Sequence, residues 1–586
     1  MAITSQDGVS TVSAADVRLM LRDGGEMALL DVREEGVFSE DGHPFFANSV
    51  PLSRLELVIR DLVPRKQTRI VVLDGGDGGD GGLAERAAAK LARMGYGNVA
   101  VMAGGSRAWA AAGFELFTGV NVPSKAFGEL VEHRCGTPHI AAAELKRRLD
   151  AGEDILIVDS RPIGEFRNMS IPGALDCPGA ELVYRVPDRL RSPDSLVVVN
   201  CAGRTRSIIG AQSLRNAGLA NPVMALENGT MGWELAGLEL ARGREDALPP
   251  PSPEGLAKAR ALADQVAERF GIARIDDAAL ARFEGEAGQR TLYVFDVRSP
   301  GEYEAGHLAA ARSAPGGQLV QATDAYMATR NARIVLVDDD GVRAVMTGSW
   351  LVQMGWPEVC VLDAGLPTGQ ARGLKAHGRP LVRGPRAPVV PEIDQAKVAT
   401  IAPAELKRLL DGGEAAVVDL APSITYEAGH IPGAWFAVRA RLPGSLDKLP
   451  RRRMLVLTSP DAALAKLAAA ELGENPHPNP PPHTPTLPSP ASGGGLGRGA
   501  EEGTEGGGFS GIRVLDGGTA AWRVAGLPLA IGREAMADTP DDCWRRPYDP
   551  YAREGARERY LKWEIELVDQ IEREGDVGFR VPASPG

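Results

Sequence analysis

The sequence predicts an α/β protein that consists of four tandem copies of one unit, each with a parallel sheet flanked by helices. At 586 residues the chain is too long for one ordinary domain, and its length alone suggests about four. An apolar segment that ends in aspartate recurs four times, at Asp31, Asp159, Asp296 and Asp419. Short apolar strands alternate with helical patterns around each aspartate, which is typical of parallel sheets with helices on both faces.

The elements of each unit follow the same order along the chain. A helical pattern, such as residues 142–149 or 403–410, precedes the strand that ends in aspartate. Each unit then has a second predicted apolar strand, at residues 69–74, 195–200, 333–338 and 453–458. A helix and a short strand lead into a glycine turn, which a tryptophan follows in three units: Trp109, Trp233 and Trp522.

These elements place the four units at residues 12–119, 137–243, 272–383 and 399–532. Proline-rich stretches at residues 248–253 and 379–391 separate the second unit from the third and the third from the fourth. The fourth unit contains an additional proline-rich and then glycine-rich stretch at about residues 474–508. This composition predicts disorder, because it cannot form a packed core.

A C-terminal helical tail is expected at residues 533–586. Within it, residues 560–571 have the apolar spacing of an amphipathic helix. The residues available for burial on this helix are Leu561, Ile565, Leu567, Val568 and Ile571. We expect the helix to dock on a neighbouring domain.

Composition and charge exclude several classes of protein. The net charge of −12 and the isoelectric point near 5.4 argue against general binding to nucleic acids or anionic membranes. Five cysteines without paired spacing indicate neither a disulfide framework nor a zinc site, so a reducing compartment is expected. The first residues do not resemble a signal peptide, and no apolar run is long enough to span a membrane. The expected location is the cytoplasm.

The candidate nucleophile is Cys201. An apolar strand ends just before it and a helical pattern begins after Ser207, so Cys201 lies on a short loop that leads into a helix N-terminus. The partial positive charge and free N–H groups of a helix start stabilise a thiolate. Arg204 and Arg206 add full positive charge within the same loop. The pattern predicts a nucleophilic cysteine that meets a small anionic substrate.

Taken together, these motifs resemble the rhodanese sulfurtransferase family over residues 12–532. The resemblance rests on the Asp-x-Arg pair Asp159 and Arg161, the six-residue Cys201–Arg206 loop, the glycine–tryptophan turns and the phrase Gly-His-Ile-Pro-Gly-Ala at residues 429–434. It implies a five-stranded parallel sheet flanked by helices in each unit. It also implies a cysteine that takes up a sulfane sulfur as a persulfide and transfers it to an acceptor.

The resemblance also assigns roles to residues of the second unit. Cys201 matches the nucleophile, and the residues that match the surrounding loop are Ala202, Gly203, Arg204, Thr205 and Arg206. Their N–H groups are expected to surround the transferred sulfur, while Arg204 and Arg206 pair with the oxygens of thiosulfate. Asp159 and Arg161 are expected to brace the loop. The persulfide can be stabilised by loop amides, so neither a metal nor an organic cofactor is expected.

The other three units lack this nucleophile. Alignment of the strand ends places Gly75, Asp339 and Ser459 at the position of Cys201, and these units are expected to be catalytically silent. The remaining cysteines, which are Cys135, Cys177, Cys360 and Cys543, are expected to be inert. His307 and His430 belong to a Gly-His motif, in place of which the second unit has Met169-Ser170. Both histidines are expected to be framework residues.

The predicted activity is that of a thiosulfate sulfurtransferase. Its donor is thiosulfate or a similar small anion, and its acceptor is cyanide or a thiol, including thioredoxin or another protein. The alternatives are a non-enzymatic persulfide carrier or partner-binding scaffold, a 3-mercaptopyruvate sulfurtransferase and a phosphatase. A phosphatase loop is longer by one residue, because it needs arginine at the sixth position after cysteine, where this chain has Ser207.

Overall fold

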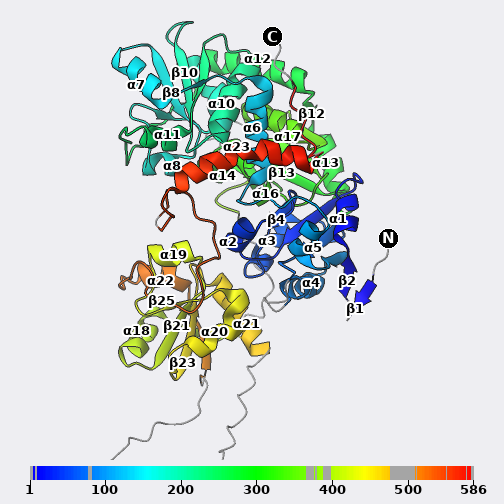
Figure 1. Ribbon diagram of the computed structural model, residues 1–586, viewed down its shortest axis with the longest axis vertical. Coiled ribbons are helices and arrows are strands. Elements are labelled where there is room, and N and C mark those ends of the chain that lie inside the picture. The colour runs from blue at the N-terminus through cyan, green and yellow to red at the C-terminus, as the bar shows by residue number, and fades with distance from the viewer. Residues whose placement is uncertain are drawn as a thin grey trace, which may run out of the picture.

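The computed structural model describes residues 4–6, 9–76, 82–363, 375–376, 379–386, 398–474, 509, 511–549, 551–575 and 577–582. Figure 1 shows four α/β domains, which we number 1 to 4 in chain order. Each contains five parallel strands with helices against them, so the predicted fold class is confirmed. The expected insertion lies outside the described residues from position 475 onward.

Domain 2 contains a sheet of five parallel strands in the order β7-β11-β10-β8-β9. These strands are β7 (His139–Ile140), β8 (Ile155–Asp159), β9 (Leu175–Asp176), β10 (Leu196–Asn200) and β11 (Val223–Leu226). Its helices are α7 (Ala142–Asp150), α8 (Ile163–Asn168), α9 (Leu182–Arg185), α10 (Thr205–Asn216) and α11 (Gly229–Leu235). All five residues of β10 are buried at the centre of the sheet, as expected for a strand with helices on both faces.

Domain 1 repeats this arrangement in the order β2-β6-β5-β3-β4 and adds the antiparallel strand β1 at one edge. Its strands are β1 (Thr4–Gln6), β2 (Val9–Val12), β3 (Met27–Asp31), β4 (Ala47–Ser49), β5 (Arg69–Leu73) and β6 (Val99–Met102). Its helices are α1 (Ala14–Met20), α2 (Glu35–Asp41), α3 (Leu55–Leu62), α4 (Leu83–Arg93) and α5 (Gly105–Ala111). The helix α6 (Val122–Cys135) connects it to domain 2.

Domain 3 has the order β12-β17-β16-β13-β15, and a small separate sheet pairs β14, β19 and β18. Its main strands are β12 (Ala273–Ile275), β13 (Leu292–Asp296), β15 (Arg312–Ser313), β16 (Arg333–Val337) and β17 (Glu358–Leu362). The small sheet consists of β14 (His307–Leu308), β18 (Lys375–Ala376) and β19 (Arg379–Val382). The helices are α13 (Asp277–Gly285), α14 (Pro300–Ala305), α15 (Gly316–Gln321), α16 (Thr323–Tyr326) and α17 (Arg343–Gln353).

Domain 4 has the order β20-β24-β23-β21-β22, which β25 extends by a sixth parallel strand from the tail. The strands are β20 (Thr400–Ile401), β21 (Ala415–Asp419), β22 (Trp435–Phe436), β23 (Met454–Thr458), β24 (Gly511–Leu515) and β25 (Ala535–Met536). The helices are α18 (Pro403–Asp411), α19 (Ser423–Ala428), α20 (Leu442–Ser445), α21 (Ala463–Glu474) and α22 (Gly518–Val524). In the parts of the chain that the structure describes, no helix has the length and apolar character to cross a membrane.

A buried ion pair recurs at the carboxyl end of the same strand in three domains. In each, the arginine Nε lies 2.9 Å from an aspartate oxygen of the pairs Asp31–Arg33, Asp159–Arg161 and Asp296–Arg298. A terminal nitrogen of each arginine also donates to a carbonyl oxygen, that of Gly42, Met169 or Gly306. In domain 4, Ala421 stands in place of the arginine, and burial raises the pKa of Asp419 to about 6.

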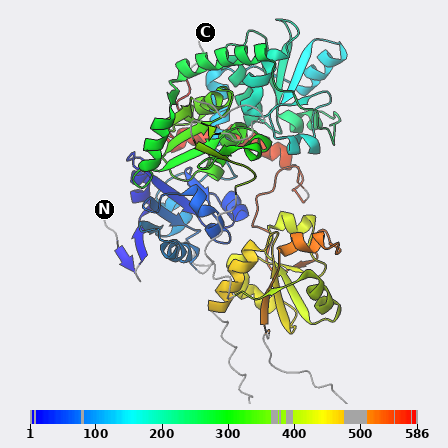
Figure 2. The ribbon, with the colours of Figure 1, turned by 180° about the vertical axis from the view of Figure 1, so that it is seen from behind.

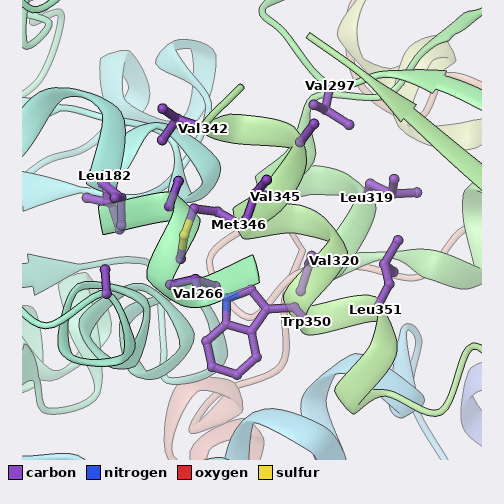
Figure 3. Packing of buried hydrophobic residues seen from close by; sticks show 14 of the residues in the cluster. Leu182, Val266, Val297, Leu319, Val320, Val342, Val345, Met346, Trp350 and Leu351 are labelled. Atoms are coloured by element: carbon purple, nitrogen blue, oxygen red, sulfur yellow. The ribbon is translucent and has the colours of Figure 1, made fainter. Parts of the chain in front are cut away.

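The domains share hydrophobic cores instead of forming separate globules. The helix α12 (Pro253–Phe270) lies between domains 2 and 3, and its Val266 belongs to a cluster with Leu182 of domain 2 and Trp350 of domain 3 (Figure 3). The Trp350 indole N–H donates to the Ser213 hydroxyl across this interface, at 2.8 Å. Figures 1 and 2 show domain 1 between this pair and domain 4.

The tail helix α23 (Ala556–Glu574) packs along α6, next to domain 2, where Figure 1 shows it crossing the molecule. The predicted docking of this helix on a neighbouring part of the protein is therefore confirmed. Leu561, Leu567 and Ile571 are buried, as expected from the apolar spacing. Ile565 is also predicted to be available for burial, but 51% of this residue is exposed.

We predict that Asp419→Asn stabilises domain 4. The pKa of Asp419 is about 6 in the folded protein and about 3.8 when the carboxyl is exposed. The folded state therefore binds more protons between these pH values, and the free energy of unfolding falls as pH rises through this range. Asparagine has no charge to bury, so at pH 7 the variant should gain on the order of 2 kcal/mol, measured by hydrogen exchange of the β21 amides.

The matched control is Asp296→Asn in domain 3. This change removes the closer ionic partner of the buried Arg298 and leaves it only Asp339, at 3.6 Å, so the loss should reach about 3 kcal/mol in hydrogen exchange of β13. If Asp419→Asn instead makes the β21 amides exchange faster, the charge of Asp419 does not destabilise domain 4.

Candidate active site

The structure places Cys201 directly after β10, on the connection to the N-terminus of α10. Asn200, the last residue of β10, donates from its amide to the Asp159 carboxylate at 2.7 Å. Asp159 in turn holds Arg161, and the side chains of both are fully buried. The Asp159–Arg161 pair thus fixes the strand end from which Cys201 projects.

The loop is held from the other side by the start of α11. The N–H groups of Thr230 and Met231 donate to the carbonyl oxygens of Cys201 and Ala202, at 2.9 and 3.1 Å. Gly229, which begins α11, has a φ of +56°, and a Cβ there would lie 2.4 Å from the Cys201 carbonyl oxygen. Only glycine permits this close approach, so the glycine turn of the sequence motif has a steric cause.

The Cys201 thiol is almost completely buried, with 2% of the residue exposed. Its sulfur lies 3.5 Å from the hydroxyl oxygen of Ser207, which donates to the Arg204 carbonyl oxygen. Burial raises the pKa of the Cys201 thiol above its usual value, and the nearby Glu564 raises it further, while Arg206 and hydrogen bonds from Ser207 oppose this. Desolvation therefore outweighs the expected stabilisation of the thiolate.

Both loop arginines border the site, but each is already paired with carboxylates. Arg204 donates to both oxygens of Glu129, at 2.8 and 2.7 Å, and also contacts Glu132. The two terminal nitrogens of Arg206 lie 2.9 Å from the two oxygens of Glu165. The sequence predicts that these arginines bind substrate oxygens, whereas in the structure their guanidinium groups are paired with glutamate side chains of the protein.

A cavity of about 540 Å³ opens beside the loop. Residues from every domain line it, including Phe38 of domain 1, Gln318 of domain 3 and Ile424 of domain 4. Lys125 of α6 and Tyr560 of α23 complete the wall. The volume is in the range of small-molecule binding sites, about 300–1,000 Å³, and exceeds what a five-atom anion requires. Of the five cysteines, which are all in described residues, Cys201 is the one that lines this cavity.

The tail contributes residues that sequence analysis did not assign to the site. The Tyr560 hydroxyl donates to Glu564 at 2.9 Å, and the Thr205 hydroxyl donates to the same oxygen at 3.2 Å. Trp544 also lines the cavity. One signal was available in the sequence, because aromatic residues form only 5% of the chain but concentrate in the tail. Periodicity cannot place such residues near Cys201, since it does not predict contacts between distant segments.

Strand register corrects the comparison with the other domains. Asp159 pairs with Asn200, and the corresponding aspartates pair with Leu73, Val337 and Thr458. The residues that follow these partners, and that match Cys201, are Asp74, Asp338 and Ser459. The expected Gly75 and Asp339 are each one residue too late, because their strands end one residue earlier than the apolar pattern predicts. Domains 1, 3 and 4 still lack a thiol at this position.

We predict that Arg206→Met slows the reaction of Cys201 with neutral iodoacetamide. Arg206 lowers the pKa of the Cys201 thiol, so its removal reduces the thiolate fraction, with a rate loss of about tenfold at pH 8. Arg204→Met, the matched control, should change the rate less than about threefold. Since the thiol pKa is raised, the wild-type rate should still rise with pH at pH 9. Equal losses in both variants would contradict this assignment.

Comparison with known proteins agrees with this architecture. The model of the rhodanese-like domain matches four times, at residues 13–112, 141–236, 277–371 and 402–525. The crystal structure of a thiosulfate sulfurtransferase from Pseudomonas aeruginosa is 44% identical, with 97% of this chain and 99% of that chain covered and a TM-score of 0.85. The HTH-type transcriptional regulator Rv0324 of Mycobacterium tuberculosis is 37% identical over 111 residues, which are 18% of this chain and about half (47%) of that protein. The chain belongs to the rhodanese-like family.

Proposed function

We propose that this protein is a thiosulfate sulfurtransferase that carries the transferred sulfur on Cys201. The observation that carries the proposal is the placement of this cysteine, which lies at a strand end, before a helix N-terminus and in the wall of a ligand-sized cavity. The likeness over nearly the whole chain to a thiosulfate sulfurtransferase supports it. The family and this likeness support sulfur transfer of the rhodanese type, and we propose thiosulfate as the specific sulfur donor.

In the first step, the Cys201 thiolate attacks the outer sulfur of thiosulfate. A new S–S bond forms to Cys201 while the S–S bond of thiosulfate breaks, and sulfite leaves with the electron pair. The total charge of −3 is unchanged, since a thiolate and a dianion become a persulfide anion and sulfite. The positive charge of Arg206 and the N-terminus of α10 favour the anionic forms of Cys201 before and after this step.

In the second step, cyanide or a thiolate attacks the outer sulfur of the persulfide. The Cys201–sulfur bond breaks, the acceptor keeps the sulfur as thiocyanate or a new persulfide, and the Cys201 thiolate is regenerated. Both steps are nucleophilic displacements at sulfur, for which this loop supplies the nucleophile and the stabilising charge. Domains 1, 3 and 4 take no chemical part in this proposal and contribute walls of the cavity.

We expect the wild-type protein to gain the mass of one sulfur atom when it is treated with thiosulfate alone. Cyanide should then remove that sulfur as thiocyanate. Cys201→Ser should gain no sulfur, because the hydroxyl is not ionised and cannot form the S–S bond. The measurement is intact-protein mass spectrometry with a colorimetric assay for thiocyanate.

The control is Cys135→Ser, which keeps the cysteine of the cavity and removes one at the end of α6. It should load sulfur as the wild type does. If the wild type loads no sulfur from thiosulfate or from mercaptopyruvate, the enzymatic proposal fails and a partner-binding scaffold takes its place.

A further inference from the structure

We propose that Lys125 of α6 is the residue that binds the anionic group of the sulfur donor. This inference rests on the proposed function, and it replaces the substrate-binding role that the sequence suggests for Arg204 and Arg206. It assigns a substrate contact to an element outside the cysteine loop.

The first argument is the burial of an unpartnered ammonium group. Only 2% of Lys125 is exposed, and the residue lines the cavity beside the loop. Among the described residues, none forms a hydrogen bond with its Nζ atom. An ammonium group has three N–H donors, and burying them without acceptors is costly unless a ligand supplies the acceptors. The unused donors therefore indicate a binding site.

The second argument is the environment that keeps this cation in place. The Nζ atom lies 4.8 Å from the ring centre of Trp544, 5.0 Å from that of Tyr560 and 4.6 Å from that of Trp563. Aromatic faces attract a cation without using its N–H donors. All three rings belong to the tail, and they leave the N–H donors of the ammonium group for a ligand, while the nearby Glu564 and Asp324 favour its charged form. Burial lowers the pKa of Lys125 to about 8, so the charge persists at neutral pH.

The third argument is that the other cations of the cavity are engaged or exposed. Arg204 and Arg206 are neutralised by Glu129 and Glu165 in two-point pairs. Arg546 also lines the cavity but is exposed to solvent, where a charge contact is weaker. Lys125 is the buried cation of this cavity whose charged group forms no hydrogen bond with a carboxylate among the described residues, although Glu564 and Asp324 lie near enough to act on its charge.

These features give Lys125 a defined role in the first step. Its N–H groups would donate to the sulfonate oxygens of thiosulfate and orient the outer sulfur toward Cys201. As the S–S bond breaks, negative charge grows on the departing sulfite, and the same contacts strengthen. The buried Glu564 lies near both Lys125 and the Cys201 thiol, so its charge acts on both groups.

The first test compares two alkylating reagents of similar size at Cys201. Iodoacetate carries a carboxylate and iodoacetamide is neutral, and the Cys201 thiolate displaces iodide from either one. Lys125→Met should lower the ratio of the iodoacetate rate to the iodoacetamide rate by about tenfold, because it removes a charge-assisted contact. The modified cysteine is identified by peptide mass spectrometry. Lys562→Met is the matched control, since this exposed lysine of α23 lies outside the cavity wall, and its ratio should not change.

The second test measures sulfur loading against thiosulfate concentration. Lys125→Met should raise the concentration that gives half the maximal loading rate by about tenfold. Lys125→Arg retains the charge and should keep the alkylation ratio within about threefold of the wild-type value.

Several outcomes would overturn the assignment. One is a ratio of the iodoacetate rate to the iodoacetamide rate that does not change in Lys125→Met. Another is a ratio that falls as far in Lys125→Arg as it does in Lys125→Met. An equal loss of rate with both reagents would mean that Lys125 only supports the fold. If the wild type loads no sulfur but the ratio still falls in Lys125→Met, the anion contact stands and thiosulfate is the wrong donor.

Discussion

Burial of charge is the constraint on which the site and its surroundings depend. The loop must bring a cysteine and positive charge together in a cavity from which water is largely excluded. Every ion buried there needs a counter-charge, a hydrogen bond or an aromatic face to offset its lost hydration. Arg206 meets this need through Glu165, and Arg204 does so through Glu129. Lys125 meets it through the rings of the tail, so the three cations differ in how free they are to meet a ligand.

This constraint also explains the structural role of domains 1, 3 and 4, which have no thiol at the position of Cys201. The Cys201 loop lies at the carboxyl ends of the strands of domain 2. Here side chains from domains 1, 3 and 4 surround this loop, and shared cores and cross-domain ion pairs fix their positions. Arg439 of domain 4, for example, forms a buried pair with Glu56 of domain 1 at 2.8 Å. Domains 1, 3 and 4 thus contribute to the enclosure of one site.

The sequence predicts the fold well because the relevant signals are local. Strand alternation, the repeated aspartates and the glycine turns each act within one domain, and Cys201 lies where the strand–loop–helix pattern places it. The charge state of the site was not predictable in this way. Glu129, Glu165 and Glu564 are ordinary helix residues in the sequence, and their effect on the loop depends on packing between distant segments. The apolar pattern also placed two strand ends one residue late, which only the register of paired strands corrects.

The position of the tail in the chain has a consequence for biosynthesis. Cys201 leaves the ribosome long before Trp544, Tyr560 and Glu564, which close its cavity from the far end of the chain. A nascent or shortened product that stops before the tail therefore lacks these three side chains beside Cys201. Only a chain that extends through α23 encloses the sulfur. The cavity around Cys201 is therefore completed only after α23 has been synthesised, and it cannot form one domain at a time.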